Sequence, residues 1–164
     1  MTLVAFDFDG TLSDSEMTVL LGERCGVADD MAAITQRAMN DEIDYAESLR
    51  ERCALLEGLD NDAALAAFDE VVLRPGAADV IRALNEAGVH TAILTGGFER
   101  GVEAALERAG VAVDDVVANR LPVADGALTG DVEGPLIEGT KDDALANLAA
   151  TQAVSMAETV AVGD

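Results

Sequence analysis

The sequence is poor in positive charge, aromatic residues and histidine. Of its 164 residues only 10 are Lys or Arg, against 32 Asp or Glu, which gives a formal net charge of −22. Proteins that bind nucleic acid need a positive surface for the phosphates, so this charge excludes nucleic acid as a partner and argues against binding to anionic membrane surfaces. Aromatic residues make up 3% and Trp is absent, which leaves few side chains on which bases or sugars could stack. With His90 as the single histidine, multi-histidine metal sites and catalysis that needs a second histidine are also excluded.

Cysteine and long apolar runs are scarce as well. Cys25 and Cys53 are too few for a disulfide framework, and we expect two reduced, buried thiols. No basic segment followed by an apolar one opens the chain, as it would in a secretory signal. No apolar run approaches the roughly 20 residues that a membrane-spanning helix needs. These features predict a cytoplasmic protein without a membrane partner.

The basic residues that are present are almost all arginines. Lys141 is the only lysine beside nine arginines. An acidic surface with almost no lysine is suited to a salt-rich cytoplasm, and we take a halophilic source as a hypothesis. Repulsion among the carboxylates would oppose folding in dilute buffer and weaken as salt shortens the Debye length.

The first half of the chain changes from a strand to a long helical stretch. Half of the residues are hydrophobic, enough for a core in one domain of ordinary size. Residues 3–8, which are apolar except for Asp7, are typical of a short buried strand. Residues 15–73 are predicted to form about four short helices, separated at Gly26, at Asn40-Asp41 and at Gly58.

The second half alternates between helical and strand patterns. The expected elements are a helix over 77–87, a strand over 89–94, a helix ending at Ala109, a strand over 115–119, a hairpin turning at Asp125-Gly126, a helix over 142–150 and a strand over 159–163. This alternation predicts an α/β fold with a Rossmann-like parallel sheet core. A small helical cap domain, residues 14–75, would be inserted after the first strand, and residues 1–13 and 76–164 would form the core. Ligands in such sheets bind at the carboxyl ends of the strands.

The clearest chemical signal follows the first strand. Asp7 and Asp9, in the run Asp-Phe-Asp-Gly-Thr-Leu, are two positions apart, so both carboxylates can face the same side. Such a pair is unfavourable without a positive partner, and Mg²⁺ prefers carboxylate and water oxygens. One carboxylate can attack phosphorus to form an aspartyl-phosphate. The other can protonate the leaving oxygen and later deprotonate water.

This run resembles motif I of the haloacid dehalogenase superfamily, and the later motifs follow in order. Thr95, in Ile-Leu-Thr-Gly-Gly-Phe-Glu, is similar to motif II, Lys141 to motif III, and Val-Ala-Val-Gly-Asp, ending at Asp164, to the start of motif IV. Within the superfamily the chain resembles the phosphoserine phosphatase family, most strongly in residues 118–121 and 128–134. The resemblance covers essentially the whole chain.

The resemblance implies roles for the residues of these motifs. Asp7 would be the nucleophile and Asp9 the acid and base. The hydroxyl of Thr95, the backbone N–H of Gly96 and the ammonium of Lys141 would bind the phosphoryl group. Mg²⁺ would be bound by Asp7, Asp9 and Asp164. As the only lysine, Lys141 fits a role that needs a compact point charge rather than the planar guanidinium of arginine.

The family's substrate is O-phospho-L-serine, which is hydrolysed to L-serine and phosphate. By resemblance, Glu16 would bind the substrate ammonium and Arg52 its carboxylate, which a guanidinium can contact with two parallel hydrogen bonds. Tyr45 and Arg52 are seven residues apart and share one helical face. Met39 would be the apolar cap residue that packs over the substrate.

Other functions remain open from the sequence. The chain could be a related phosphatase, or a phosphotransferase, acting on another small phosphomonoester. It could also be an inactive truncated form that binds metabolites, since the sequence stops at Asp164, where motif IV of the family continues. We therefore expect a fragment of a longer chain. The sequence does not indicate an oligomeric state.

Overall fold

A parallel sheet forms the centre of the molecule. The structure is a computed structural model that describes residues 1–163, so the predicted metal ligand Asp164 lies outside the described residues. The strands are β1 (Leu3–Phe6), β2 (His90–Phe98), β3 (Asp115–Asn119) and β6 (Thr159–Val162), in the order β3-β2-β1-β6, and all are parallel. The predicted α/β fold with a parallel sheet core is thereby confirmed.

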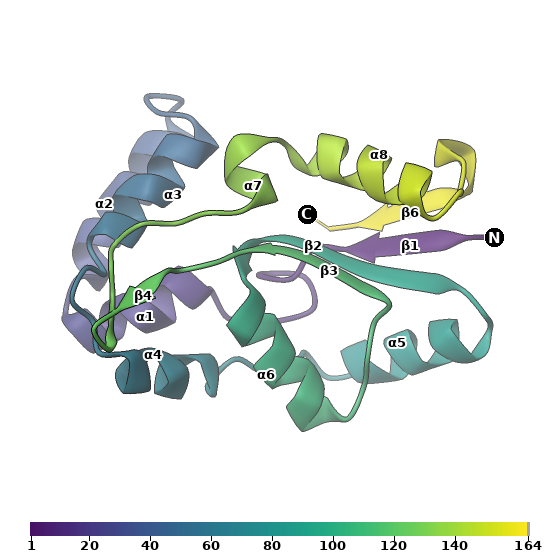
Figure 1. Ribbon diagram of the computed structural model, residues 1–164, viewed down its shortest axis with the longest axis horizontal. Helices are drawn as coiled ribbons and strands as arrows, with labels where there is room; N and C mark the ends of the chain where they lie inside the picture. The colour runs from purple at the N-terminus through teal and green to yellow at the C-terminus, as the bar shows by residue number, and fades with distance from the viewer. Residues whose placement is uncertain (164) are drawn as a thin grey trace.

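Helices cover both faces of the sheet (Figure 1). On one face lie α5 (Ala77–Glu86) and α6 (Glu99–Ala109), and on the other lies α8 (Lys141–Thr151). Side chains alternate between the two faces along β1. Leu3 and Ala5 join a cluster with Leu148 of α8, and Val4 and Phe6 join the larger cluster on the opposite face. Burial on both faces explains why β1 is a continuous apolar run.

Four short helices occupy the segment between β1 and α5, as predicted. We call residues 14–75 the insert; its helices are α1 (Met17–Cys25), α2 (Ala28–Met39), α3 (Tyr45–Ala54) and α4 (Asn61–Phe68). Local signals set their ends. Gly26 takes the left-handed conformation, φ 72°, after α1, and the Asp44 carboxylate accepts a hydrogen bond from the Glu47 backbone N–H at the start of α3.

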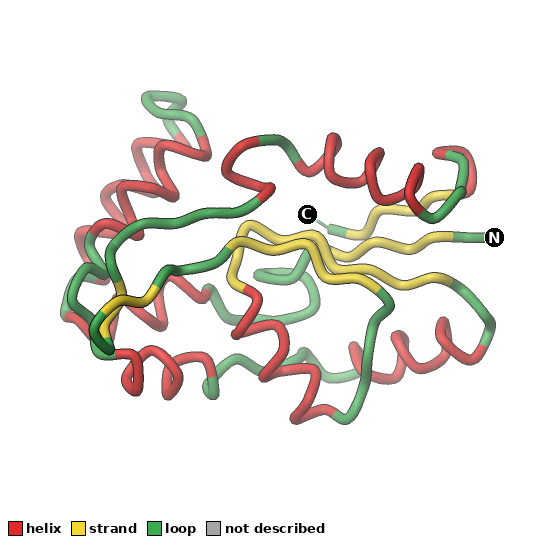
Figure 2. The backbone as a smooth tube through the Cα atoms, in the orientation of Figure 1, coloured by secondary structure: helices red, strands yellow, loops and turns green. Residues whose placement is uncertain are grey.

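The insert packs tightly on the rest of the chain. The hairpin β4 (Val123–Ala124) and β5 (Ala127–Leu128) runs beside it (Figure 2). The Leu128 backbone N–H donates to the Leu59 carbonyl at 2.8 Å. The Phe68 ring of α4 meets the Phe98 ring of β2 edge to face, with centroids 6.3 Å apart. The larger hydrophobic cluster therefore continues from the sheet into the insert.

Two details differ from the sequence prediction. The second strand does not end at residue 94: β2 extends to Phe98, and its register against β3 shifts between Leu94 and Phe98. Gly96-Gly97 favours a turn locally, but both residues are buried in the sheet, where the pairing with β3 is irregular; we call this segment, residues 95–97, the bulge. The short helix α7 (Pro135–Glu138) was not predicted. In the part of the chain that the structure describes, no helix combines the length and the apolarity needed to cross a membrane.

Candidate active site

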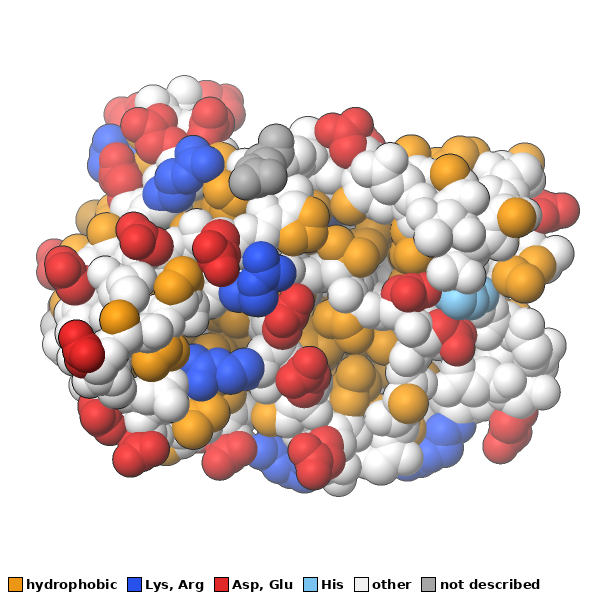
Figure 3. Space-filling view, in the orientation of Figure 1, with side chains coloured by type: hydrophobic (Ala, Val, Ile, Leu, Met, Phe, Trp, Pro, Cys, Tyr) orange, Lys and Arg blue, Asp and Glu red, His pale blue; other side chains and the backbone are white. Residues whose placement is uncertain are grey.

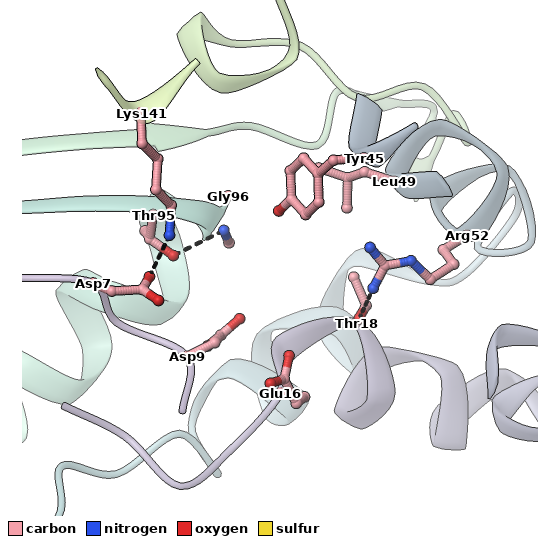
Figure 4. A pocket seen from close by; sticks show the side chains of 11 residues that line it. Asp7, Asp9, Glu16, Thr18, Tyr45, Leu49, Arg52, Thr95, Gly96 and Lys141 are labelled. Atoms are coloured by element: carbon pink, nitrogen blue, oxygen red, sulfur yellow. Dashed lines mark hydrogen bonds and ion pairs between the residues drawn. The ribbon is translucent and has the colours of Figure 1, made fainter. Parts of the chain in front are cut away.

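A cavity of about 190 Å³ lies at the carboxyl ends of β1 and β2. The core contributes Asp7, Asp9, Thr95, Gly96, Gly97 and Lys141 to its lining, and the insert contributes Glu16, Thr18, Tyr45, Leu49 and Arg52. Figure 4 shows two groups of side chains facing each other across it, the carboxylates with Lys141 on one side and Arg52 with Tyr45 on the other. The site is therefore closed jointly by the sheet and the insert.

Asp7 directly continues β1 and is paired with a lysine. Its backbone N–H donates to the Val162 carbonyl at 2.8 Å, which extends the ladder between β1 and β6 by one residue. Its carboxylate Oδ1 lies 2.8 Å from Lys141 Nζ and accepts the Phe8 backbone N–H at 2.8 Å. Lys141 is the first residue of α8, whose start is fixed by a capping box between Thr140 and Asp143. Helix capping therefore places the only lysine beside Asp7.

Asp9 is the most perturbed carboxyl group of the site. Burial raises its pKa from 3.8 to about 7, and the nearby charges of Glu16 and Asp7 add to the shift. Its Oδ2 accepts a long hydrogen bond, 3.5 Å, from the Met17 backbone N–H, and its buried Oδ1 has no partner within residues 1–163. A buried, unpaired carboxylate oxygen is unfavourable, so this atom is suited to carry a proton or to contact a cation.

The bulge in β2 supplies polar groups beside the two carboxylates. The Gly97 backbone N–H donates to Thr95 Oγ1 at 2.9 Å. A Cβ added to Gly96 would lie 1.8 Å from the Tyr45 hydroxyl oxygen, and one added to Gly97 would lie 3.1 Å from Asp9 Oδ2. Glycine at these two positions lets the strand backbone approach both the insert and the carboxylates.

The opposite end of the cavity carries one positive and one negative side chain. Arg52 Nη1 donates to Thr18 Oγ1, and Arg52 Nε donates to the Ser48 carbonyl, both at 3.3 Å. These bonds orient the guanidinium toward the cavity (Figure 4). Burial raises the pKa of Glu16, and the charge of Arg52 opposes that rise.

The structure brings together most of the residues that the sequence singled out. Asp7, Asp9, Glu16, Arg52, Thr95, Gly96 and Lys141 all line the cavity. Met39 does not: it ends α2 with 74% of its surface exposed.

Several lining residues have no role predicted from the sequence, among them Thr18, Tyr45, Leu49 and Gly97. Tyr45, Leu49 and Arg52 are spaced four and three residues apart on α3, so their shared face was a usable signal. For Thr18 the sequence offered no signal beyond its position two residues after Glu16.

The two carboxyl groups of Asp7 and Asp9 are the oxygen donors of the site that a metal ion would contact. Among the described residues no group of three or more His, Cys, Asp or Glu side chains could hold one. Asp7 and Asp9 are nevertheless a pair of hard oxygen donors, and Asp9 Oδ1 has no partner within residues 1–163. Mg²⁺ usually keeps several waters and takes only one or two carboxylates, so the residues present fit this ion.

Comparison with known proteins defines the class. The family model for haloacid dehalogenase-like hydrolases matches residues 4–164. The chain therefore belongs to this family of enzymes.

Its relatives define a narrower group. The phosphoserine phosphatase of Halobacterium salinarum is 57% identical over all 164 residues, which span 78% of that protein. The phosphoserine phosphatase of Methanocaldococcus jannaschii is 36% identical over 99% of this chain and 76% of its own length. A substrate-bound phosphoserine phosphatase complex superposes with a TM-score of 0.90 at 35% identity, covering 99% of this chain and 77% of that one. A structure described as a phospho-aspartyl intermediate analogue of phosphoserine phosphatase gives a TM-score of 0.89 at 36% identity, with 99% and 78% coverage. Within the hydrolases, these similarities place the chain among the phosphoserine phosphatases.

Proposed function

We propose that this site hydrolyses O-phospho-L-serine to L-serine and phosphate through an aspartyl-phosphate on Asp7, with Mg²⁺ bound beside it. The observation that carries the proposal is the pairing of two unlike carboxyls in one cavity. Asp7 is paired with the ammonium of Lys141, 2.8 Å away, whereas Asp9 is buried and its pKa is raised to about 7. One group is thus suited to attack and the other to carry a proton.

Asp7 acts as the nucleophile. Its Oδ1 is engaged by Lys141 and by the Phe8 backbone N–H, which leaves Oδ2 to attack phosphorus and displace the serine oxygen. The bond from phosphorus to the serine oxygen breaks, the phosphoryl group is joined to Asp7 as an acyl phosphate, and the Lys141 ammonium offsets its negative charge.

Asp9 moves the proton in both half-reactions. With a pKa of about 7, a substantial fraction of the molecules carries a proton on Asp9 near neutral pH. That proton goes to the leaving serine oxygen, and the carboxylate left behind then takes a proton from the water that attacks the aspartyl-phosphate. Asp9 is thereby returned to its starting state as inorganic phosphate forms.

The groups around the bulge bind the phosphoryl oxygens. Thr95 supplies a hydroxyl, Gly96 a backbone N–H and Lys141 an ammonium. Asp7 and Asp9 would hold Mg²⁺, which supplies positive charge against the phosphoryl oxygens when it is bound. The remaining predicted ligand, Asp164, stays part of this proposal as an expectation from the motif.

The far end of the cavity selects the amino acid. The Arg52 guanidinium, oriented by Thr18, would bind the substrate carboxylate, and the Glu16 carboxylate would bind its ammonium. An apolar contact from Met39 remains an expectation from the family pattern. We assign the insert, residues 14–75, as a cap: Tyr45 lies against Gly96 of the core and helps to exclude water from the reacting groups.

The test is release of inorganic phosphate from L-phosphoserine in KCl-rich buffer, with and without Mg²⁺. The wild-type chain should release phosphate and free serine in equal amounts, and only with Mg²⁺ present.

Asp7→Asn keeps the shape of the side chain but removes the nucleophile, so formation of the phosphoryl-enzyme should disappear. Turnover by Asp7→Asn close to that of the wild type would refute the covalent mechanism. Transfer of the phosphoryl group to added homoserine in preference to water would make the enzyme a phosphotransferase.

A further inference from the structure

Asn119 is a buried amide next to the site but outside its lining. It is the last residue of β3, pairs with Phe98 beyond the bulge of β2, and is fully buried. Its Nδ2–H donates to the Gly96 carbonyl at 3.2 Å, and its Oδ1 accepts the Leu136 backbone N–H at 3.2 Å. One side chain therefore joins two segments that are far apart in the sequence.

The first of these segments is the bulge that carries Thr95. The peptide between Gly96 and Gly97 is fixed at both ends, because Asn119 donates to its carbonyl and its N–H donates to Thr95 Oγ1 at 2.9 Å. A hydroxyl has one proton and two acceptor positions. With one acceptor position of Thr95 taken by the Gly97 N–H, the hydroxyl proton is directed away from that peptide. Holding the peptide in this orientation thus sets the direction in which Thr95 can donate.

The second segment leads to Lys141. Leu136 belongs to α7, which ends three residues before Lys141. Just before α7, Gly134 has φ 142°, and a Cβ added to it would lie 2.5 Å from Asn119 Oδ1. The backbone can pass this close to the amide only because residue 134 is glycine. Asn119 therefore fixes the start of the segment that brings the lysine to Asp7.

We propose that Asn119 is a positioning residue that holds the Thr95–Gly97 bulge and the segment leading to Lys141 in the geometry needed for phosphoryl transfer. It contacts neither substrate nor metal in this role and acts only through the groups that it orients. The inference rests on the proposed function, since it takes Thr95, Gly96 and Lys141 as the groups that bind the phosphoryl oxygens. Loss of either bond should displace those groups, and small displacements of this kind have large effects on kcat.

The most informative substitution is Asn119→Asp. A protonated carboxyl reproduces both bonds of the amide, because one oxygen can accept from Leu136 N–H while the O–H donates to the Gly96 carbonyl. A deprotonated carboxyl loses the donor and sets a charged oxygen against that carbonyl. Burial raises the pKa of a carboxyl group at this position. The ratio of the variant's kcat to the wild type's should therefore be highest at mildly acidic pH and fall by about tenfold or more toward mildly alkaline pH.

Using this ratio cancels the titration of groups that both proteins share. These include Asp9 in the site and the charged side chains on the flanking segments, Arg120 with Glu99 and Glu133. The matched control is Asn85→Asp. Asn85 also bridges two segments, donating to the Ala112 carbonyl and accepting from the Thr91 hydroxyl, but it lies beside the amino-terminal end of β2. Its kcat ratio should not change with pH.

Further measurements separate positioning from a general loss of stability. Asn119→Leu should lower kcat by about 10- to 100-fold and weaken inhibition by inorganic phosphate, in protein whose circular dichroism shows it folded. A pH-independent ratio for Asn119→Asp, or an activity loss that only follows its unfolded fraction, would overturn the inference. If Asn119→Leu does not fold, the pH profile of Asn119→Asp decides alone.

All of these measurements are repeated with p-nitrophenyl phosphate. If the wild type hydrolyses this ester but not phosphoserine, the proposed substrate is refuted, and the role of Asn119 can still be tested with the ester.

Discussion

At the scale of single residues, the two motif I carboxyls show how position sets chemistry. Asp7 and Asp9 are two residues apart, yet Lys141 pairs with the first, whereas the second is buried with an oxygen that has no partner within residues 1–163. The second environment is costly for a charged group. Burial of Asp9 therefore lowers the stability of the folded chain, and it also gives the site a proton that can be transferred near neutral pH.

This cost predicts a pH-dependent effect of Asp9→Asn on stability. The pKa of Asp9 is about 7 in the folded chain against 3.8 ordinarily, so between these values the folded state binds more protons than the unfolded state. The free energy of unfolding of the wild type should then fall as pH rises through this window, whereas an amide cannot ionise. In chelator-treated protein, Asp9→Asn should melt above the wild type at pH values over 7, and the difference should vanish near pH 4. Exposed Asp131→Asn, with the same change in charge, is the control. A difference that does not depend on pH would contradict the assigned cause.

A second prediction at this scale concerns substrate selection. Arg52 lines the cavity, whereas Arg50, two positions away on α3, is exposed to solvent. Arg52→Ala should raise the KM for phosphoserine far more than that for p-nitrophenyl phosphate, because a charge-assisted bond worth roughly 1.5–3 kcal/mol is lost only with the amino acid. Arg50→Ala should change neither value. Equal losses on both substrates would show that Arg52 is structural.

At the scale of elements, the contact between α3 and the β2 bulge closes the cavity. A Cβ at residue 96 would lie 1.8 Å from the Tyr45 hydroxyl oxygen and 2.8 Å from the ring carbon that bears it. Gly96→Ala should therefore push α3 away from the core and lower kcat/KM by about 10- to 100-fold. Adding Tyr45→Ala removes the clash, so the double variant should be more active than Gly96→Ala alone. If the loss of kcat/KM in the double variant, as a free energy, equals the sum of the losses in Gly96→Ala and Tyr45→Ala, the two residues do not interact.

The elements also show what could be predicted from the sequence. The strand before Asp7, the four helices of the insert and the Asp125-Gly126 hairpin have local signals in apolar runs, caps and turn residues, and all were predicted. The bulge was missed because Gly96-Gly97 favours a turn locally, whereas pairing with β3, some 20 residues later, decides the outcome. No roles were predicted for Tyr45 and Thr18, because Tyr45 contacts Gly96 and Thr18 contacts Arg52, and both contacts join segments that are distant in the sequence. The position of Met39 depends on how α2 packs, which its sequence neighbours do not determine.

At the scale of the whole molecule, charge is the dominant feature. With 32 acidic and 10 basic side chains, most carboxylates cannot find a cationic partner within the chain. Figure 3 shows acidic side chains spread over the visible face rather than gathered in one patch. Ion pairs such as Arg37 with Glu51 and Arg24 with Glu70 lie partly exposed at the surface, and such pairs contribute little stability. The net effect of the surface charge on folding is therefore repulsive.

This repulsion predicts that the protein needs salt to be stable. The Debye length falls from about 10 Å at 0.1 M salt to about 3 Å at 1 M, so KCl should screen the carboxylates from one another. The melting temperature should rise clearly between low and molar KCl, in keeping with the 57% identity to the protein of Halobacterium salinarum.

The matched variant replaces Glu86, Glu103 and Glu107, three exposed acids on α5 and α6, with Gln. Because it carries three fewer negative charges, it should reach the same melting temperature at lower KCl and show a shallower dependence on salt. Sucrose stabilises compact states without screening charge, so it should raise the melting temperatures of both proteins equally. A melting temperature that does not change with KCl, or an identical salt dependence in the two proteins, would contradict a surface adapted to a salt-rich environment.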